Sequence, residues 1–356
     1  MKPIRLAALA AALIIPAAMP ALSPAQPAAP ASCAPGVGMQ FICGLTGPED
    51  IVLVPNTDWM IVSGLANAQV VGSGGISLVG AKNHVAIKVP LSSADKARAP
   101  FTNCPGPIDP TKFSAHGLNI RPAGKGRSTL YVVGHGGREA IEIFDVKTTA
   151  KGAPTITWAG CIPAPTGAFI NSVAPLSDGR VLATNFYQAP LTMADALQGK
   201  NTGPVMIWKP GGAFTNLPGT NLPGANGIEA TPDRRYIFVA VTGTSSVMRY
   251  ELANTEKPAE VIKTDFRTDN LRWGPDGKLL LAGPGQDAAC KPGPGVRCLN
   301  TAVVGALDPK TMKLTEVLRA KPEPNFQGLS TALIVGDTIW LGVPRGDRIA
   351  YTALPK

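Results

Sequence analysis

The sequence predicts an all-β fold built from a repeated unit of short strands. Of its 356 residues, 39 are Gly and 35 are Pro, and these types cost roughly 1 and 3 kcal/mol at interior helical positions. Strand–turn–strand patterns recur from about residue 45 onward, as in 176–184, 231–241 and 273–283. Turns rich in Gly, Asp or Pro between apolar runs indicate hairpins. Only 191–199 is expected to be helical.

Polar residue pairs mark the beginning of successive units, at intervals of 43 to 67 residues. The six pairs are Glu49-Asp50, His116-Gly117, Asn171-Ser172, Asn226-Gly227, Asp269-Asn270 and Ser330-Thr331. A period of about 50 residues with four strands per unit is typical of a β-propeller blade. The sequence therefore predicts a six-bladed β-propeller. Periodicity alone leaves a large β-sandwich or an irregular two-domain β protein open.

The N-terminus has the pattern of an export signal. Lys2 and Arg5 precede an apolar stretch, and small residues end it near Ala25, so 1–25 is predicted to be a cleaved signal peptide. A lipoprotein anchor at Cys33 is disfavoured because Pro30 stands where an aliphatic residue is expected. We expect a Pro/Ala-rich spacer over 26–40, a single propeller domain over 41–356, and a periplasmic or secreted protein.

Six cysteines in an exported chain favour disulfides. Six cysteines allow 15 connectivities, so spacing suggests a pairing without fixing it. Cys33 with Cys43, and Cys290 with Cys298, could each close a local loop. A long-range bridge between Cys104 and Cys161 would then remain. The absence of CxxC spacing and of a nearby His argues against zinc.

The formal net charge is +9, but the basic residues are scattered along the chain without a Lys/Arg run or interleaved aromatic residues. Such a distribution is typical of a solvated surface. We therefore expect no nucleic-acid partner. The N-terminal apolar run is broken by Pro16 and Pro20 and is too short to span a membrane, and no later segment reaches membrane-spanning length. We therefore expect no stable membrane insertion.

The polar pairs are rich in oxygen. Carboxylates occur at Glu49, Asp50 and Asp269, and side-chain amides at Asn171, Asn226 and Asn270. Any one of these residues alone is typical of a turn. Their recurrence at the start of successive blades favours convergence on the propeller axis, and mixed carboxylate and amide oxygens suit calcium.

With these motifs, the chain resembles the calcium-dependent six-bladed propellers of the paraoxonase and arylesterase family, within the wider gluconolactonase and strictosidine synthase group. The resemblance runs from about residue 40 to the end in the family's order. The matching segments are 47–51 (GPEDI), 116–118 (HGL), 130–135 (LYVVGH), 171–173 (NSV) with 183–185 (ATN), 225–228 (ANGI) followed by 231–233 (TPD), 268–270 (TDN) and 327–331 (QGLST).

The resemblance implies two calcium sites. The catalytic calcium would be held by Glu49, Asn171, Asn226, Asp269 and Asn270. A second, structural calcium would be held by Asp50 and the backbone carbonyl of Leu118. The family's third ligand there is an Asp, and this chain has Ser172 at that position, which weakens a site for a hard cation.

The resemblance also implies a two-histidine arrangement of His116 and His135. His116 would act as general base on a water molecule, with His135 orienting it or relaying the proton. The alternative is that His116 only lines the cavity and that His135 only packs or hydrogen-bonds. The family's disulfide between its first and last strands has no match, because no Cys follows Cys298. Strand pairing must therefore close the ring.

The function implied is a calcium-dependent hydrolase of carboxylic esters, a lactonase with arylesterase activity and a small-molecule ester or lactone as substrate. The metal would polarise the carbonyl that water attacks. A G-x-S-x-G nucleophile elbow does not occur, which disfavours a serine esterase of the α/β-hydrolase type. Two alternatives stay open: a sugar-lactonase of the gluconolactonase type, and a non-catalytic propeller that binds a ligand.

Overall fold

The computed structural model describes residues 33–355 apart from 37, 67–73, 94–95, 151, 292, 294–295 and 297. The segment Ser32–Lys356 forms one compact unit. The predicted signal peptide (1–25) and most of the spacer (26–40) lie outside the described residues. The described chain therefore consists of the predicted propeller region and the segment that immediately precedes it.

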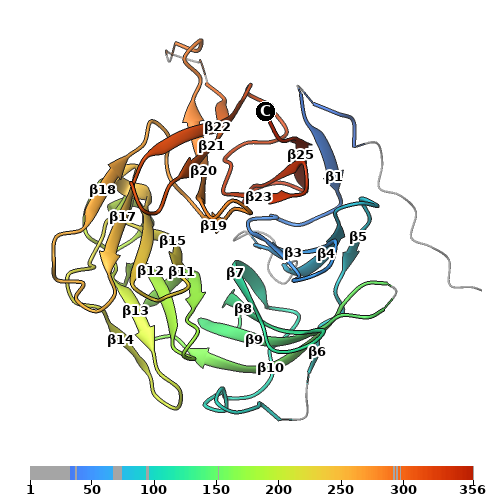
Figure 1. The fold of residues 1–356 in the computed structure, drawn as a ribbon, viewed down its shortest axis with the longest axis vertical. Helices are drawn as coiled ribbons and strands as arrows, with labels where there is room; N and C mark the ends of the chain where they lie inside the picture. The colour runs from blue at the N-terminus through green and yellow to red at the C-terminus, as the bar shows by residue number, and fades with distance from the viewer. Residues whose placement is uncertain are drawn as a thin grey trace, which may run out of the picture. The chain divides into compact units, whose positions relative to one another are not determined.

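The strands form six sheets, numbered here as blades in chain order (Figure 1). Blade 1 contains β2 (Ile51–Leu53), β3 (Trp59–Gly64), β4 (Gly75–Gly80) and β5 (Ala86–Lys88). Blade 2 contains β7 (Ser114–Pro122), β8 (Arg127–His135), β9 (Ala140–Lys147), β10 (Thr155–Pro163) and, at its outer edge, β6 (Ser92–Ser93). Blade 3 contains β11 (Ala168–Pro175), β12 (Val181–Gln188), β13 (Val205–Trp208) and β14 (Phe214–Asn216).

The remaining blades continue in the same order around the ring. Blade 4 contains β15 (Ala225–Ala230), β16 (Tyr236–Val241), β17 (Ser246–Glu251) and β18 (Glu260–Lys263). Blade 5 contains β19 (Leu271–Trp273), β20 (Leu279–Gln286), β21 (Asn300–Leu307) and β22 (Leu314–Ala320). Blade 6 contains β23 (Thr331–Val335), β24 (Thr338–Gly342), β25 (Arg348–Ala353) and β1 (Gln40–Cys43). The predicted helical segment is confirmed as α1 (Met193–Leu197), and a 3-10 turn follows at Thr242–Thr244.

The innermost strands form a closed ring. Strands β2, β7, β11, β15, β19 and β23 each contact the next, and β23 contacts β2. The chain is thus an all-β six-bladed propeller, as the period of the polar pairs predicts. Each pair lies in the innermost strand of its blade or directly before it.

The ring is closed by strand pairing between the two ends of the propeller. β1 adds to the outer edge of blade 6 antiparallel to β25, with Gln40 opposite Tyr351 and Cys43 opposite Arg348. A disulfide joins Cys33 to Cys43. The last residue of the closing strand is therefore tied to the segment that precedes it. This bears out the expectation that strand pairing closes the ring.

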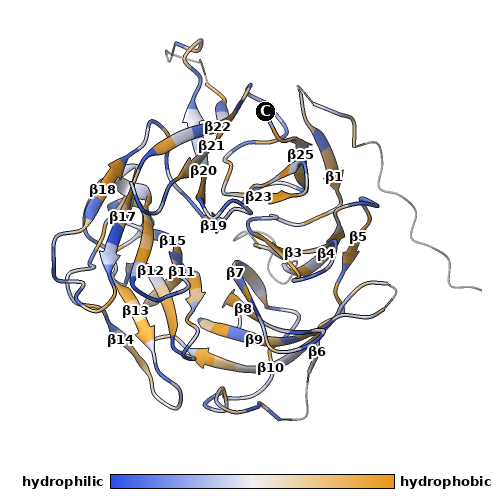
Figure 2. Ribbon diagram, in the orientation of Figure 1, coloured by the Kyte–Doolittle hydropathy of each residue, from blue (hydrophilic) through white to orange (hydrophobic). Residues whose placement is uncertain are grey.

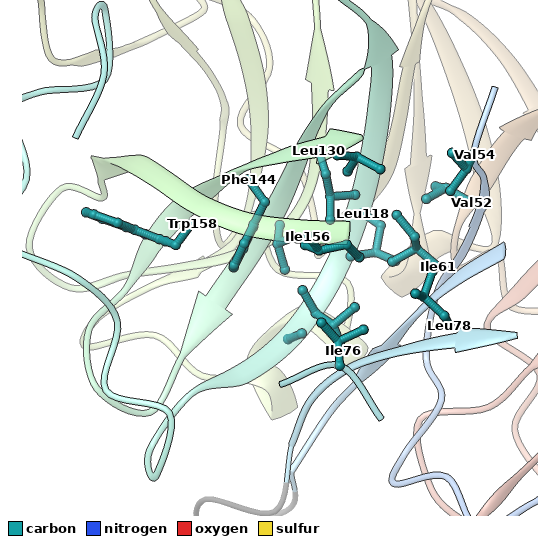
Figure 3. Packing of buried hydrophobic residues seen from close by; sticks show 14 of the residues in the cluster. Val52, Val54, Ile61, Ile76, Leu78, Leu118, Leu130, Phe144, Ile156 and Trp158 are labelled. Atoms are coloured by element: carbon teal, nitrogen blue, oxygen red, sulfur yellow. The ribbon is translucent and has the colours of Figure 1, made fainter. Parts of the chain in front are cut away.

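The hydrophobic core lies between neighbouring blades. Figure 3 shows the contact between blades 1 and 2, where Ile61 and Leu78 face Leu118 and Leu130. Similar clusters fill the other blade boundaries, so each sheet contributes buried apolar residues to two clusters. Figure 2 shows hydrophobic residues along the strands of the blades. Close packing on both sides fixes the inner strands, and this holds the axial side chains in place.

The other two cysteine pairs are Cys104–Cys161 and Cys290–Cys298, so all three bridges are those that the spacing suggests. Three disulfides are typical of a protein of an oxidising, extracellular compartment. Among the described residues, no helix has the length and apolar character needed to cross a membrane.

Candidate functional site

The innermost strands bend where the site residues lie. In β7, β11 and β15 the pairing register shifts between Ala115 and Leu118, between Ile170 and Val173, and between Ala225 and Ile228. Such bulges redirect side chains that a regular strand would place on alternate faces. The residues inside these three shifts are His116-Gly117, Asn171-Ser172 and Asn226-Gly227.

Two glycines allow the inner strands to approach one another closely. A Cβ on Gly117 would lie 2.3 Å from the carbonyl oxygen of Asn171, and one on Gly227 would lie 2.6 Å from that of Asp269. No side chain fits at these distances. The second residue of each of these polar pairs is therefore glycine because the next blade's site residue passes directly beside it.

Hydrogen bonds link the polar pairs across blade boundaries. The Gly227 amide donates to the Asp269 carbonyl at 3.1 Å, and the Asn270 amide donates to the Ser330 carbonyl at 2.9 Å. The Ser330 hydroxyl donates to the Glu49 carbonyl at 2.6 Å. The structure thus brings residues more than 200 positions apart onto one axis, as the convergence argument predicts.

Five predicted ligands form what we call the axial oxygen cluster: Glu49, Asn171, Asn226, Asp269 and Asn270. The side-chain amide nitrogen (Nδ2) of Asn270 donates to Glu49 Oε1 at 2.7 Å, and Nδ2 of Asn226 donates to Thr242 Oγ1 at 3.0 Å. Because the nitrogens are engaged, the amide oxygens of both residues are directed away from these partners. Glu49, Asn171, Asn226 and Asn270 are buried, and Asp269 is half-buried.

Four buried oxygens of this cluster have no hydrogen-bond partner among the described residues. They are Glu49 Oε2, Asn171 Oδ1, Asn226 Oδ1 and Asn270 Oδ1. An unpaired buried polar atom costs about 1–3 kcal/mol, and native structures contain few of them. Four in one cluster, all of them oxygens, fit a hard cation that accepts carboxylate and amide ligands.

The two carboxyl groups of the cluster are perturbed in the same direction. Burial, together with the nearby Asp50 and Asp269, raises the pKa of Glu49 well above its usual range. Burial also raises the pKa of Asp269 to about 7, although a hydrogen bond from Asn226 opposes the change. Without a cation, this cluster disfavours negative charge, and a bound cation would reverse that preference.

The two predicted histidines are in direct contact. Nδ1 of His116 lies 2.9 Å from Nε2 of His135, and both rings are buried. Burial and the neighbouring His135 hold the pKa of His116 well below its ordinary value. The free Nε2 of His116 lies 3.8 Å from Glu49 Oε1, at the edge of the axial oxygen cluster.

A third residue, which the sequence analysis missed, completes this chain of contacts. Oε2 of Glu139 lies 2.8 Å from Nδ1 of His135, and Oε1 accepts a hydrogen bond from the Ile170 amide at 2.7 Å. Glu139 lies in the turn between β8 and β9, four residues after His135. A carboxylate at that short spacing was the available signal. It does not belong to the repeating polar pairs, so periodicity could not reveal it.

Aromatic rings continue from the histidines. The rings of His135 and Phe169 are parallel, with centroids 4.5 Å apart, and those of Phe169 and Tyr187 are parallel at 4.8 Å. Phe169 and Tyr187 are only partly buried. The stack fixes the plane of the His135 ring and places an apolar surface beside the relay.

The residues predicted for a second calcium have other partners. Arg272 donates through Nη2 to the Asp50 carboxylate and, at 2.6 Å, to the carbonyl of Leu118. Ser172, at the position where the resemblance implies a third ligand, is fully buried, and its hydroxyl has no hydrogen-bond partner in the described chain. A guanidinium group therefore contacts both oxygen ligands predicted for the structural ion.

A second group of possible ligand atoms lies in blade 2. Cys104, Glu142 and Cys161 approach one another closely enough to hold an ion. The two cysteines form a disulfide, however, and Glu142 accepts hydrogen bonds from Arg138 and from the indole of Trp158. We assign this group a structural role.

Comparison with known proteins bears on the fold. Neither protein-family models nor curated protein sequences give a match to the chain. Solved structures do. They include a luciferin-regenerating enzyme, with 12% identity, 87% of this chain and 92% of that chain covered, and a TM-score of 0.53. A protein proposed to be a gluconolactonase has 16% identity, covers 90% of this chain and 95% of its own, and gives a TM-score of 0.50.

At these identities the shared property is the fold. The resemblance that the motifs indicate is thereby confirmed at the level of the six-bladed propeller fold. The activity has to be argued from the site itself.

Proposed function

We propose that the protein is a calcium-dependent hydrolase of carboxylic esters, with lactones as its main substrates and aryl esters as secondary ones. The observation that carries the proposal is the position of an imidazole nitrogen at the edge of the axial oxygen cluster: His116 Nε2 lies 3.8 Å from Oε1 of Glu49, whose other carboxylate oxygen, Oε2, is buried and unpaired. Calcium held by the axial oxygen cluster would supply a Lewis acid for the substrate carbonyl and its developing oxyanion.

The hydrogen-bond chain selects one tautomer for each histidine. A carboxylate can only accept hydrogen bonds, so the Nδ1 atom of His135 that faces Glu139 carries the hydrogen. Nε2 of His135 then accepts from Nδ1 of His116, which leaves Nε2 of His116 with a free lone pair. His116 is thus the general base in this proposal, and His135 with Glu139 orients it and stabilises the imidazolium.

The reaction needs one proton to move twice. His116 Nε2 takes a proton from the attacking water as the new carbon–oxygen bond forms. The same nitrogen then returns the proton to the leaving alkoxide oxygen as the ester bond breaks. In a lactone, the leaving alkoxide stays attached to the product, which is a hydroxy acid.

The decisive assay uses purified protein on aliphatic lactones, gluconolactone and phenyl acetate, before and after complete removal of calcium with a chelator. We expect lactone hydrolysis that stops on chelation and returns with added calcium. Activity that survives complete removal would contradict the proposal. A marked preference for gluconolactone would favour the sugar-lactonase alternative, and tight calcium binding without turnover of any substrate would favour a ligand-binding propeller.

We also propose that the protein is exported to the periplasm or secreted, and that its partner is a small-molecule ester or lactone. The three disulfides support export. N-terminal sequencing of protein recovered from the periplasm or the medium tests it. A mature chain that begins near residue 26 is expected, and one that retains Met1 in the cytoplasm would contradict it.

A further inference from the structure

Arg272 is a buried cation on the axis of the propeller. Its side chain is 6% exposed, and it follows Asn270 of the axial oxygen cluster by two residues in blade 5. An isolated charge at such a depth is costly, so its partners decide whether it is tolerated.

Every N–H group of this guanidinium has an oxygen partner. Nε donates to the Ile51 carbonyl at 3.2 Å, and Nη1 donates to the Leu271 carbonyl at 2.9 Å and to Glu229 Oε1 at 3.4 Å. Nη2 donates to Asp50 and to the Leu118 carbonyl. A guanidinium has five N–H donors, and here all five are used.

These acceptors would suit a metal ion equally well. They comprise two carboxylates and three backbone carbonyls, contributed by blades 1, 2, 4 and 5. Oxygen cages of this composition bind calcium in proteins. Asp50 is held in place independently of Arg272, because its carboxylate also accepts hydrogen bonds from the Leu118 amide at 2.7 Å and from Thr331 Oγ1 at 3.0 Å.

We propose that the Arg272 guanidinium replaces the second, structural calcium of the resembling family, so that the channel of this protein is closed by a cation that belongs to the chain. The residue at Ser172 agrees with this. Where the resemblance implies a carboxylate for a divalent ion, this chain has a neutral hydroxyl, and the guanidinium of Arg272 carries one positive charge instead of two.

The replacement has a consequence for the molecule without calcium. A metal in the channel is lost to a chelator, whereas Arg272 is not. The inner strands of blades 1, 2, 4 and 5 should therefore stay joined around Arg272 when calcium is removed. The protein would lose activity on chelation and keep its fold.

The test is to remove the guanidinium and count calcium ions. Arg272→Ala leaves the five oxygens without a cation, and we expect this variant to bind one calcium ion more per chain than the wild type in isothermal titration. Calcium should also raise its melting temperature by more than it raises that of the wild type. Equal numbers of bound ions, with equal responses to calcium, would overturn the proposal.

Arg249→Ala is the matched control. Arg249 is also largely buried and pairs with Glu260 and the Pro309 carbonyl, but it lies in β17, away from the axis. Its removal should destabilise the fold without creating a site, so the number of calcium ions bound should equal that of the wild type. If this control also bound an extra calcium ion, the loss of any buried arginine would be enough to create calcium binding. That result would count against the proposal.

A second measurement decides the matter if Arg272→Ala does not fold even in calcium. In the double variant Glu49→Gln/Asp269→Asn, which keeps Arg272, the axial oxygen cluster loses both carboxylates. We expect no tightly bound calcium in it by atomic emission after dialysis. A buried ion that survives these substitutions would occupy the channel and overturn the proposal. Failure of the proposed function can be told apart from failure of this proposal. If the wild type bound no calcium, the proposed function would fail, but Arg272→Ala could still gain one ion.

Discussion

Nδ1 of His116 and Nε2 of His135 lie 2.9 Å apart, so the two imidazoles share one hydrogen bond. The bond joins adjacent strands, since His116 lies in β7 and His135 at the end of β8. One blade therefore contributes both rings. Their spacing depends on the bulge at Ala115 to Leu118.

His116→Gln should lower kcat for lactones by roughly 10²- to 10⁴-fold, the range that general-base catalysis contributes. Glutamine can keep a hydrogen bond to His135 but cannot accept the water proton. Calcium affinity should stay within a few-fold of that of the wild type, because His116 is not a ligand in the axial oxygen cluster. Steady-state kinetics and calcium titration measure the two quantities separately.

His84→Gln is the control for this substitution. His84 is exposed in the turn between β4 and β5, and its ring contacts Tyr351. Its replacement should leave kcat unchanged. Full activity in His116→Gln would remove His116 as the base while leaving the metal hypothesis intact.

Glu139→Gln should lower kcat on the order of 10- to 100-fold, with little change in KM, as part of the contribution of the proton relay. A neutral amide cannot stabilise the imidazolium, and it can present its nitrogen to His135, which favours the wrong tautomer. Glu139→Asp should recover less than the wild-type rate because the shorter side chain cannot span 2.8 Å in the same geometry.

The matched control for Glu139 is Glu256→Gln, an exposed carboxyl away from the axis. Its kinetics should equal those of the wild type. If Glu139→Gln had a higher KM and an unchanged kcat, Glu139 would act in substrate binding instead of in the proton relay.

The repeating features of this fold could be predicted from the sequence. The polar pairs mark each blade because the innermost strand must present the same position to the axis every time. The same logic predicted the axial oxygen cluster. In this cluster a single hydrogen bond joins Asn270 to Glu49, which are 221 positions apart in the sequence. Symmetry in the fold thus becomes periodicity in the sequence.

Features that belong to one blade alone could not be predicted in this way. Glu139 lies in a single turn, and Arg272 is one arginine among many basic residues, without a counterpart in other blades. The role of each depends on side-chain direction across a blade boundary. That direction is set by packing and bulges, which periodicity does not encode.

Calcium should stabilise the folded state through the axial oxygen cluster. At a concentration 100 times the dissociation constant, a ligand that binds only the folded state adds about 2.7 kcal/mol to the free energy of unfolding. Asn226→Ala removes one of the unpaired oxygens, so this gain should shrink at the same calcium concentration. Chemical unfolding with and without calcium measures the difference.

Asn254→Ala serves as the control, since Asn254 is exposed in a loop of blade 4. It should keep the full calcium-dependent gain. Equal gains in Asn226→Ala and Asn254→Ala would place the ion outside the axial oxygen cluster.

Removal of the Cys33–Cys43 bridge should destabilise the ring closure. With Cys33→Ser and Cys43→Ser together, we expect a loss of about 2 kcal/mol in unfolding free energy, at the lower end for disulfides because the loop is short. Hydrogen exchange should accelerate in β1 and β25 before it does in other strands, since these two strands join the ends of the propeller.

The corresponding double serine variant of Cys290 and Cys298 provides the comparison. That bridge closes a loop after β20 and does not touch the closing strands. Exchange in β1 and β25 should stay at wild-type rates there. Uniform acceleration in both variants would mean that the closing strands have no separate dependence on their bridge.

Glu229 should make stability depend on pH. Burial raises the pKa of its carboxyl from 4.5 to about 7, with Arg272 opposing the change and Asp50 adding to it. Between about pH 4.5 and 7 the folded state then binds more protons than the unfolded state, so this group's contribution to stability falls as pH rises through that window. Glu229→Gln has no carboxyl to titrate at this position. The free energy of unfolding of the variant minus that of the wild type should therefore increase by about 3 kcal/mol between pH 4 and pH 8.

Urea unfolding at intervals across this range tests the prediction, with Glu256→Gln, an exposed residue, as the reference. The difference in the free energy of unfolding between Glu229→Gln and the wild type should be small at pH 4, where the Glu229 carboxyl is mostly protonated in both the folded and the unfolded state. It should grow through pH 7, because ionisation then places a second negative charge beside a single guanidinium. A difference that stays constant with pH would mean that Glu229 has the same pKa in the folded and unfolded states, and would contradict the prediction.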